Sequence, residues 1–104
     1  MPVVDFKGHV DLLLLGLLEA GPAHGYQMVE TLRERSEGVF DLPEGTIYPA
    51  LYRLERAGAI DSRWETVSGR RRRMYFLTRR GRAELAKQQE AWKTFVRGME
   101  AVLA

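Results

Sequence analysis

Two short stretches of this 104-residue chain carry side chains suited to binding a polyanion. The first, residues 46–56, brings together tyrosine, threonine and arginine side chains. The second, residues 70–73, is a run of four arginines directly after Ser68-Gly69. Arginine forks bind phosphates and guanine edges, and hydroxyl groups bond phosphate oxygens. These residue types therefore indicate recognition of nucleic acid through charge and hydrogen bonds.

The net charge of +2 hides an uneven distribution along the chain. Residues 45–82 contain ten arginines and three acidic residues, whereas the rest contains six basic and eleven acidic residues. A basic middle between acidic ends predicts a polyanionic partner for the middle alone. The plainer interpretation of the same charges is a solvated arginine face.

Helical periodicity positions the first stretch. A helix is predicted from about Glu44, after Pro43, to Ala57-Gly58, where glycine suits the left-handed cap. At about 100° per residue, one face is apolar: Ile47, Ala50, Leu51, Leu54 and Gly58. The opposite face is polar, with Pro49, Tyr52, Arg53 and Arg56, flanked by Thr46 and Tyr48. This helix would present its polar face to a nucleic acid groove.

A hairpin positions the arginine run. Residues 60–66 alternate as a strand does, Val67 to Arg72 are predicted to form the turn, and residues 73–78 return as a second strand. Arginines at the tip would supply the charge that releases counterions from phosphates. Arg73 alternatively points back toward the body, and Trp64 is interpreted as hairpin packing.

Three further helices complete the prediction. Residues 8–19 hold six leucines spread around the helix, and Gly21-Pro22 ends it. Residues 24–36 form a second amphipathic helix, with His24 as a capping residue. The last helix, about 79–103, follows Thr78 as N-cap. Leu85, Trp92 and Met99 recur there at seven residues and predict a partner helix.

This order describes a winged helix-turn-helix: mainly α with a small β-hairpin, and a long C-terminal dimerisation helix. Residues 1–78 would form the DNA-binding domain and residues 79–104 the dimerisation helix. The predicted DNA contacts are Tyr26, Gly45, Thr46, Tyr48, Pro49, Tyr52, Arg53, Arg56, Ser68, Gly69, Arg70, Arg71 and Arg72. Alternatives remain open for four of them: Tyr48 and Tyr52 could pack on the surface, Pro49 could serve only to bend the helix, and Arg56 could pair with Glu55 or Asp61.

The apolar positions of the first and last helices predict a homodimer. Its predicted interface contains Leu13, Leu17, Leu85, Trp92, Phe95, Met99 and Val102. Trp92 has two interpretations: a residue of the dimer core, or the aromatic wall of an effector pocket together with Leu14 and Val96.

Several classes of function are disfavoured. The chain has no cysteine, and neither His9 nor His24 has a second ligand at metal-binding spacing, so no metal or cofactor is predicted. No nucleophile elbow, phosphate-binding glycine loop or carboxylate pair indicates an enzyme. No apolar run approaches the ~20 residues of a membrane span, and the N-terminus lacks a secretory pattern, which predicts a cytoplasmic protein without a membrane partner.

The chain resembles the PadR family of transcriptional regulators. The resemblance rests on His24-Gly25-Tyr26, on Leu42-Pro-Glu-Gly-Thr-Ile-Tyr-Pro-Ala-Leu-Tyr-Arg-Leu-Glu-Arg-Ala-Gly58 and on Tyr75-Phe-Leu-Thr, followed by Gly81. It implies a homodimeric repressor that binds a pseudo-palindromic double-stranded operator and is released by a small aromatic or apolar effector. A single C-terminal helix resembles the shorter subfamily, where a tryptophan aligned with Trp92 lines a drug-binding pore in some members.

Two other functions fit the same basic surface. One is a winged-helix protein-interaction module that binds an acidic partner, and the weaker one is binding of structured RNA. Sequence-selective binding to a DNA duplex would distinguish the first interpretation from both.

Overall fold

The computed structural model describes residues 9–104. Its elements are four helices and three strands: α1 Val10–Leu18, β1 Ala23–His24, α2 Gly25–Arg35, α3 Glu44–Arg56, β2 Ile60–Val67, β3 Arg70–Leu77 and α4 Arg79–Leu103. The predicted winged helix-turn-helix with a long C-terminal helix is confirmed. Residues 1–8 lie outside the described residues. They include the start of the predicted DNA-binding domain, 1–78, and the first residue of the predicted first helix, 8–19.

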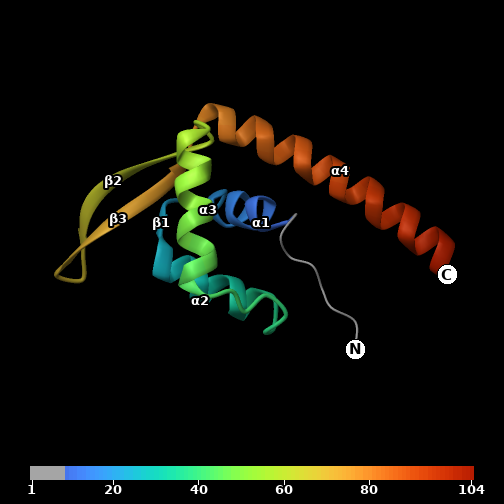
Figure 1. Ribbon diagram of the computed structural model, residues 1–104, viewed down its shortest axis with the longest axis horizontal. Helices are drawn as coiled ribbons and strands as arrows, with labels where there is room; N and C mark the ends of the chain where they lie inside the picture. Colours follow the sequence, from blue (N-terminus) through green and yellow to red (C-terminus); the bar gives the residue numbers. More distant parts are fainter. Residues whose placement is uncertain (1–8) are drawn as a thin grey trace.

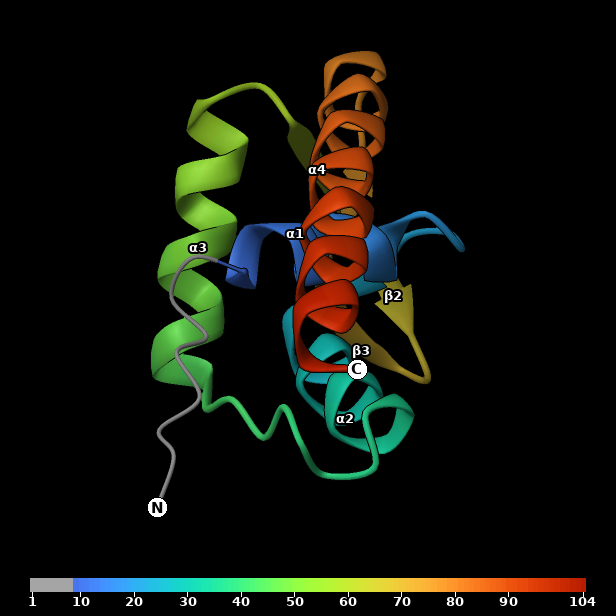
Figure 2. The same cartoon turned by 90° about the vertical axis from the view of Figure 1, so that its right-hand side faces the viewer.

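The body of the molecule is built around α1, α2 and α3, and the β2–β3 hairpin and the distal half of α4 project from it in opposite directions (Figure 1). Viewed from the end of α4, α1 lies behind that helix, with α3 to one side of it (Figure 2). The largest fully buried side chains are Leu14, Leu15 and Leu18 of α1, with Met28, Ile47, Leu51 and Ile60 from the elements around it. A single apolar core therefore fixes α3 against α1 and the base of the hairpin.

The end of α3 and the start of α4 meet at one tight junction. Gly58 (φ +80°) closes α3, because its N–H bonds the Glu55 carbonyl and the next N–H, of Ala59, bonds the Leu54 carbonyl. The hydroxyl of Thr78 lies 2.6 Å from the Gly58 carbonyl oxygen and accepts the Gly81 N–H at 3.0 Å. The predicted N-cap at Thr78 is confirmed, and it also ties α4 to α3.

The hairpin differs from the prediction in the extent of its turn. Only Ser68 and Gly69 form the turn, both with positive φ (51° and 78°), and strand pairing continues up to Val67 opposite Arg70. Two left-handed residues are what a two-residue turn needs to match the twist of its strands. The predicted turn from Val67 to Arg72 was therefore too long, and all four arginines belong to β3.

The sheet contains a strand that the sequence did not predict. β1 has two residues and pairs antiparallel with β3, placing Ala23 opposite Tyr75 and His24 opposite Met74, so the strand order is β1-β3-β2. The strand β1 therefore extends the sheet beside β3, and the Arg63 guanidinium lies 5.1 Å from the centroid of Phe76, an apolar residue of β3. The hairpin is thereby anchored to the body at its base.

His24 caps α2, as predicted: its Nδ1 accepts the N–H of Gln27 at 3.1 Å. Burial, and secondarily the charge of Arg72, lower the pKa of His24 from its ordinary value of 6.5. The neutral ring is also the form that can accept this bond, so the folded state disfavours protonation.

Acidification should therefore weaken the fold through His24. The unfolded chain takes up a proton near pH 6.5 and the folded chain only at lower pH. This contribution to stability is complete above pH 6.5 and is lost as the pH falls through the folded pKa. In His24→Asn, which caps without titrating, Tm should fall less between about pH 7 and pH 5 than in the parent. Parallel pH profiles for the two proteins would contradict this assignment.

Candidate nucleic-acid interface

One side of α3 is exposed along its length. Ile47, Ala50, Leu51 and Leu54 are buried, as the periodicity predicted. The opposite face is exposed: Gly45, Thr46, Pro49, Tyr52, Arg53 and Arg56. The Tyr52 side chain is the most open of the helix's aromatic residues, with 63% of its surface exposed. Large aromatic and charged groups thus stand on a rigid helix without being used by the core.

Arg56 and Tyr52 form one unit on this face. Nη1 of Arg56 donates to the Tyr52 hydroxyl at 3.3 Å, and its guanidinium carbon lies 5.6 Å from the ring centroid. The pairing of Arg56 with Glu55 or Asp61, weighed from the sequence, is not found. Because its partner is neutral, Arg56 keeps its full charge for an anion.

Arg53 has a different environment. Its Nη2 donates to Oδ1 of Asp11, 2.7 Å away on α1, although the two residues are 42 positions apart. Both side chains remain partly exposed, at 60% for Arg53 and 36% for Asp11. The guanidinium has five N–H donors, so donors remain for another ligand.

Tyr48 and Tyr26 lie near the start of α2. The Tyr48 ring covers Gly25 so closely that a Cβ there would lie 2.6 Å from ring atoms, yet 42% of Tyr48 stays exposed. Tyr48 therefore packs on the domain surface and still offers an edge to solvent. Tyr26 is exposed on the first turn of α2, and a hydrogen bond to Glu30 raises the pKa of its phenol.

The arginines of β3 alternate between the two faces of the hairpin. Strand register places Arg71 and Arg73 on the face that carries Trp64, and Arg70 and Arg72 on the other face. Within residues 9–104, Arg70, Arg71 and Arg72 make no ion pair, and Arg70 and Arg71 are exposed. The hairpin therefore presents positive charge on both faces next to its exposed turn, Ser68-Gly69.

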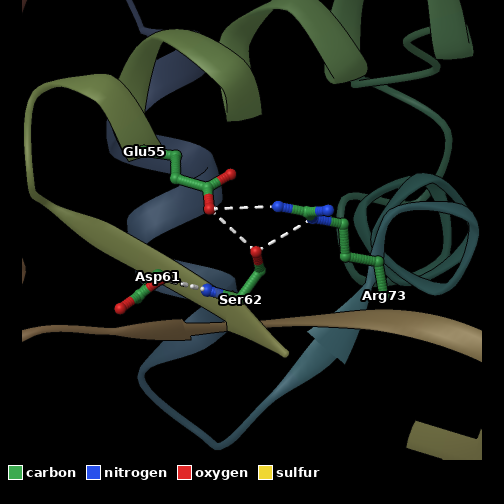
Figure 3. Close-up of polar contacts among 4 residues, drawn as sticks. All are labelled: Glu55, Asp61, Ser62 and Arg73. Atoms are coloured by element: carbon green, nitrogen blue, oxygen red, sulfur yellow. Dashed lines mark hydrogen bonds and ion pairs between the residues drawn. The ribbon is translucent and has the colours of Figure 1, made fainter. Parts of the chain in front are cut away.

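Arg73 turns toward the body, which was the alternative weighed for it. Its Nε donates to Oγ of Ser62 at 2.9 Å, and its Nη2 donates to Glu55 at 3.4 Å (Figure 3). Ser62 donates in turn to the same Glu55 oxygen at 2.8 Å, while its own N–H bonds Asp61. These contacts join the last turn of α3 to both strands of the hairpin, so the helix and the hairpin keep one relative position.

Trp64 packs against the other strand of the hairpin, as interpreted from the sequence, and 55% of its surface is still exposed. The guanidinium carbons of Arg71 and Arg73 lie 5.1 Å and 5.8 Å from its ring centroid. An open indole held between two cations can contact a sugar or a phosphate-lined groove. The alternation of residues 60–66 predicted that Trp64 shares a face with Ile60 and Ser62. Its exposure could not be predicted in this way, because it arises where the hairpin extends beyond the core.

The predicted dimer residues lie along α1 and α4. Leu13, Leu17, Leu85, Trp92 and Phe95 all line one hollow of about 630 Å³, which also reaches the end of α2. Trp92 and Phe95 stack with ring centroids 5.9 Å apart, and both are about half exposed. Farther along α4, Met99 and Val102 are 45% and 82% exposed. Apolar surface therefore continues from the hollow to the end of the chain.

The predicted effector residues are separated by the structure. Trp92 lines the hollow, whereas Leu14 is fully buried in the core and Val96 is half-buried outside the lining. Leu14 cannot contact a ligand in the hollow unless the core opens. The set of three is thus not one site in this structure, and Trp92 alone faces the hollow.

Among residues 9–104, no group of three or more histidine, cysteine, aspartate or glutamate side chains is arranged to hold a metal ion. No helix in the same part of the chain combines the length and the hydropathy needed to cross a bilayer.

Comparison with known proteins agrees with this architecture. The model of the transcriptional regulator PadR-like family matches residues 14–87. The transcriptional regulator Rv3488 of Mycobacterium tuberculosis is 38% identical over 65 residues, which cover 62% of this chain and 61% of that protein. A PadR family transcription regulator from Clostridium difficile R20291 has a TM-score of 0.84 at 34% identity, covering 93% of this chain and all of that one. Bacillus subtilis PadR in complex with operator DNA has a TM-score of 0.70 at 28% identity, covering 77% of this chain and 46% of that one.

Proposed function

Because this chain belongs to the PadR-like family of transcriptional regulators, we propose that it binds double-stranded operator DNA as a homodimer and represses transcription. Membership of a family of transcriptional regulators also agrees with the expectation that the chain is not an enzyme. A function on chromosomal DNA would place the protein in the cytoplasm.

The exposed face of α3 is the observation that carries the proposal. Tyr52, Arg53 and Arg56 stand on a helix that the core holds in place, and a helix of this kind fits the major groove. Arg53 and Arg56 would contact base edges, and the hydroxyls of Thr46, Tyr48 and Tyr52 would contact phosphates. The solved complex of Bacillus subtilis PadR with operator DNA supports this assignment by similarity.

The hairpin would add sequence-independent affinity. Arg70, Arg71 and Arg72 are unpaired within the described part of the chain, and their charges can neutralise phosphates beside the groove. The Glu55–Ser62–Arg73 contacts would hold these charges at a constant distance from α3. We place the DNA-binding function in residues 1–78.

The dimer is proposed from the apolar surface of α1 and α4. Trp92, Phe95, Met99 and Val102 are exposed on the described chain, and a second copy of α4 would cover them. Residues 79–104 would then act as the dimerisation helix. A symmetric dimer presents two α3 helices to half-sites about 34–36 Å apart, which favours a pseudo-palindromic operator. A small aromatic or apolar effector would contact Trp92 in the hollow.

To test the proposal, the purified protein is mixed with a pool of duplexes that have a randomised centre, and the bound duplexes are sequenced. Enrichment of one pseudo-palindromic sequence supports the proposal, and a mobility shift with that duplex then gives its affinity. Retention of structured RNA or of an acidic protein, without any preference among duplexes, would contradict it.

Replacing Arg70, Arg71 and Arg72 with glutamine should weaken binding to all duplexes alike. Each phosphate contact contributes about 0.9 to the slope of log affinity against log salt, and the proposed dimer loses six arginines, so the slope should become shallower by up to about 5. The measurement is a titration of operator and unrelated duplexes over a range of salt concentrations.

A matched control removes three charges from α4 outside its heptad seam: Lys87, Lys93 and Arg97 to glutamine. These side chains are exposed and belong to α4, whose distal half projects away from the hairpin (Figure 1). The control should leave the slope close to that of the parent. Equal changes in the two triple variants would show that only net charge matters and that the hairpin makes no phosphate contact.

A further inference from the structure

The ion pair between α1 and α3 joins the proposed base-reading helix to a residue outside the helix-turn-helix. Nη2 of Arg53 donates to Oδ1 of Asp11 at 2.7 Å, the shortest distance between charged groups on the exposed face of α3. Within residues 9–104, the other arginine of this face, Arg56, has the neutral Tyr52 as its hydrogen-bond partner and makes no ion pair. Arg53 is therefore the one arginine of that face whose direction is fixed by a carboxylate.

Folding stability does not account for this contact. The side chains are 60% and 36% exposed, and an ion pair so open to water contributes little to the free energy of unfolding. A carboxylate bonded to an arginine of the proposed DNA-binding face also offsets part of that arginine's charge and lowers affinity for any duplex. A group that stabilises little and opposes general binding is accounted for by the geometry that it imposes on Arg53.

The geometry suits a base-reading arginine. A free arginine side chain rotates about several bonds and loses that freedom when it meets a base. One bond from Nη2 to Asp11 restricts these rotations in advance and leaves Nη1 and the second Nη2 hydrogen available. Two donors at that spacing match the O6 and N7 acceptors of guanine.

We propose that Asp11 is a specificity-determining residue, which orients Arg53 so that its remaining donors meet one base pair of the operator. The carboxylate acts through Arg53 and does not itself contact the base. This inference rests on the proposed DNA-binding function, which it deepens.

The experiment compares selections from the randomised duplex pool by the full-length parent, Arg53→Ala and Asp11→Asn. The base pair at which the parent and Arg53→Ala differ defines the Arg53-dependent position. Asp11→Asn should lower discrimination at that position about five- to tenfold and leave the other positions unchanged. In the Arg53→Ala background, Asp11→Asn should have no further effect there.

Two further variants make the result specific. Asp41→Asn removes the same charge from another aspartate–arginine pair, with Arg33 at 3.8 Å, and should leave discrimination at the Arg53-dependent position intact. Asp11→Glu keeps the charge but displaces it by one methylene, so its discrimination should fall between those of the parent and Asp11→Asn. It also provides a test should Asp11→Asn fail to give a cooperative unfolding transition.

The outcomes separate the two levels of inference. Unchanged discrimination in Asp11→Asn, or tighter binding to all duplexes at the same discrimination, overturns the role of Asp11 while DNA binding stands. Absence of an Arg53-dependent position overturns it as well. A parent protein that enriches no sequence overturns the proposed function, and the role of Asp11 with it.

Discussion

Replacing Gly81 with alanine should strongly destabilise this chain. A Cβ at position 81 would lie 1.8 Å from the Ala59 carbonyl oxygen and 2.9 Å from its carbon, and neither backbone atom can rotate away as a side chain does. Relief requires α4 to separate from the end of α3. That separation breaks the hydrogen bonds of Thr78, including the one that its N–H donates to the Ala59 carbonyl oxygen at 3.1 Å.

The expected cost is about 3 kcal/mol or more, a large part of the stability of a small domain. For a chain of about 100 residues this lowers Tm by more than about 10 °C. Thermal unfolding followed by circular dichroism measures it directly. A cooperative transition within a few degrees of the parent would show that the junction is looser than described.

Gly98→Ala in the same helix is the matched control. A Cβ at position 98 meets no atom within 4 Å, and the residue is exposed. Alanine favours a helix over glycine by up to about 1 kcal/mol, so this variant should unfold at the same temperature as the parent or a few degrees higher. Opposite effects of one chemical change at two positions of α4 would locate the strain at the junction.

Phe95→Glu should separate the proposed dimer into monomers. The Phe95 ring is 56% exposed, stacks on Trp92 and borders the hollow, so a charge there would be buried without a partner in the dimer. The described chain itself should stay folded, because Phe95 lies outside the buried core. A single subunit loses the second half-site, and affinity for a pseudo-palindromic operator should fall about 100-fold or more.

Light scattering after size-exclusion chromatography gives the oligomeric state, and a mobility shift with the selected operator gives the affinity. Ala86→Glu introduces the same charge at an exposed position of α4 away from the heptad seam and should preserve both properties. A Phe95→Glu protein that remains dimeric, or that binds the operator undiminished as a monomer, would contradict the proposed assembly.

The sequence predicted the fold and the exposed face of α3 for a definite physical reason. Ile47, Ala50, Leu51 and Leu54 recur at helical spacing, so burying them leaves the polar residues outside whatever the rest of the chain does. Gly58 ends α3 and Thr78 begins α4, each through hydrogen bonds to residues a few positions away. Features that depend on local spacing could therefore be predicted.

Features that depend on a distant partner could not. β1 has two residues and exists only because β3 lies beside it. The turn at Ser68-Gly69 was overestimated because arginine has no strong preference against a strand, so only the register revealed where pairing ends. The Arg53–Asp11 pair joins positions 42 apart, and no spacing in the sequence predicts it.

The junction of Gly58, Ala59, Thr78 and Gly81 makes α4 a lever. At 1.5 Å per residue its 25 residues extend about 37 Å, while Thr78, the cap at its near end, is bonded to Gly58 directly after α3. A small rotation at this pivot becomes a displacement of several ångströms at the far tip. In the proposed dimer, a molecule that changes the angle at which the two α4 helices cross would change the distance between the two α3 helices. It would do so without contacting either α3 helix.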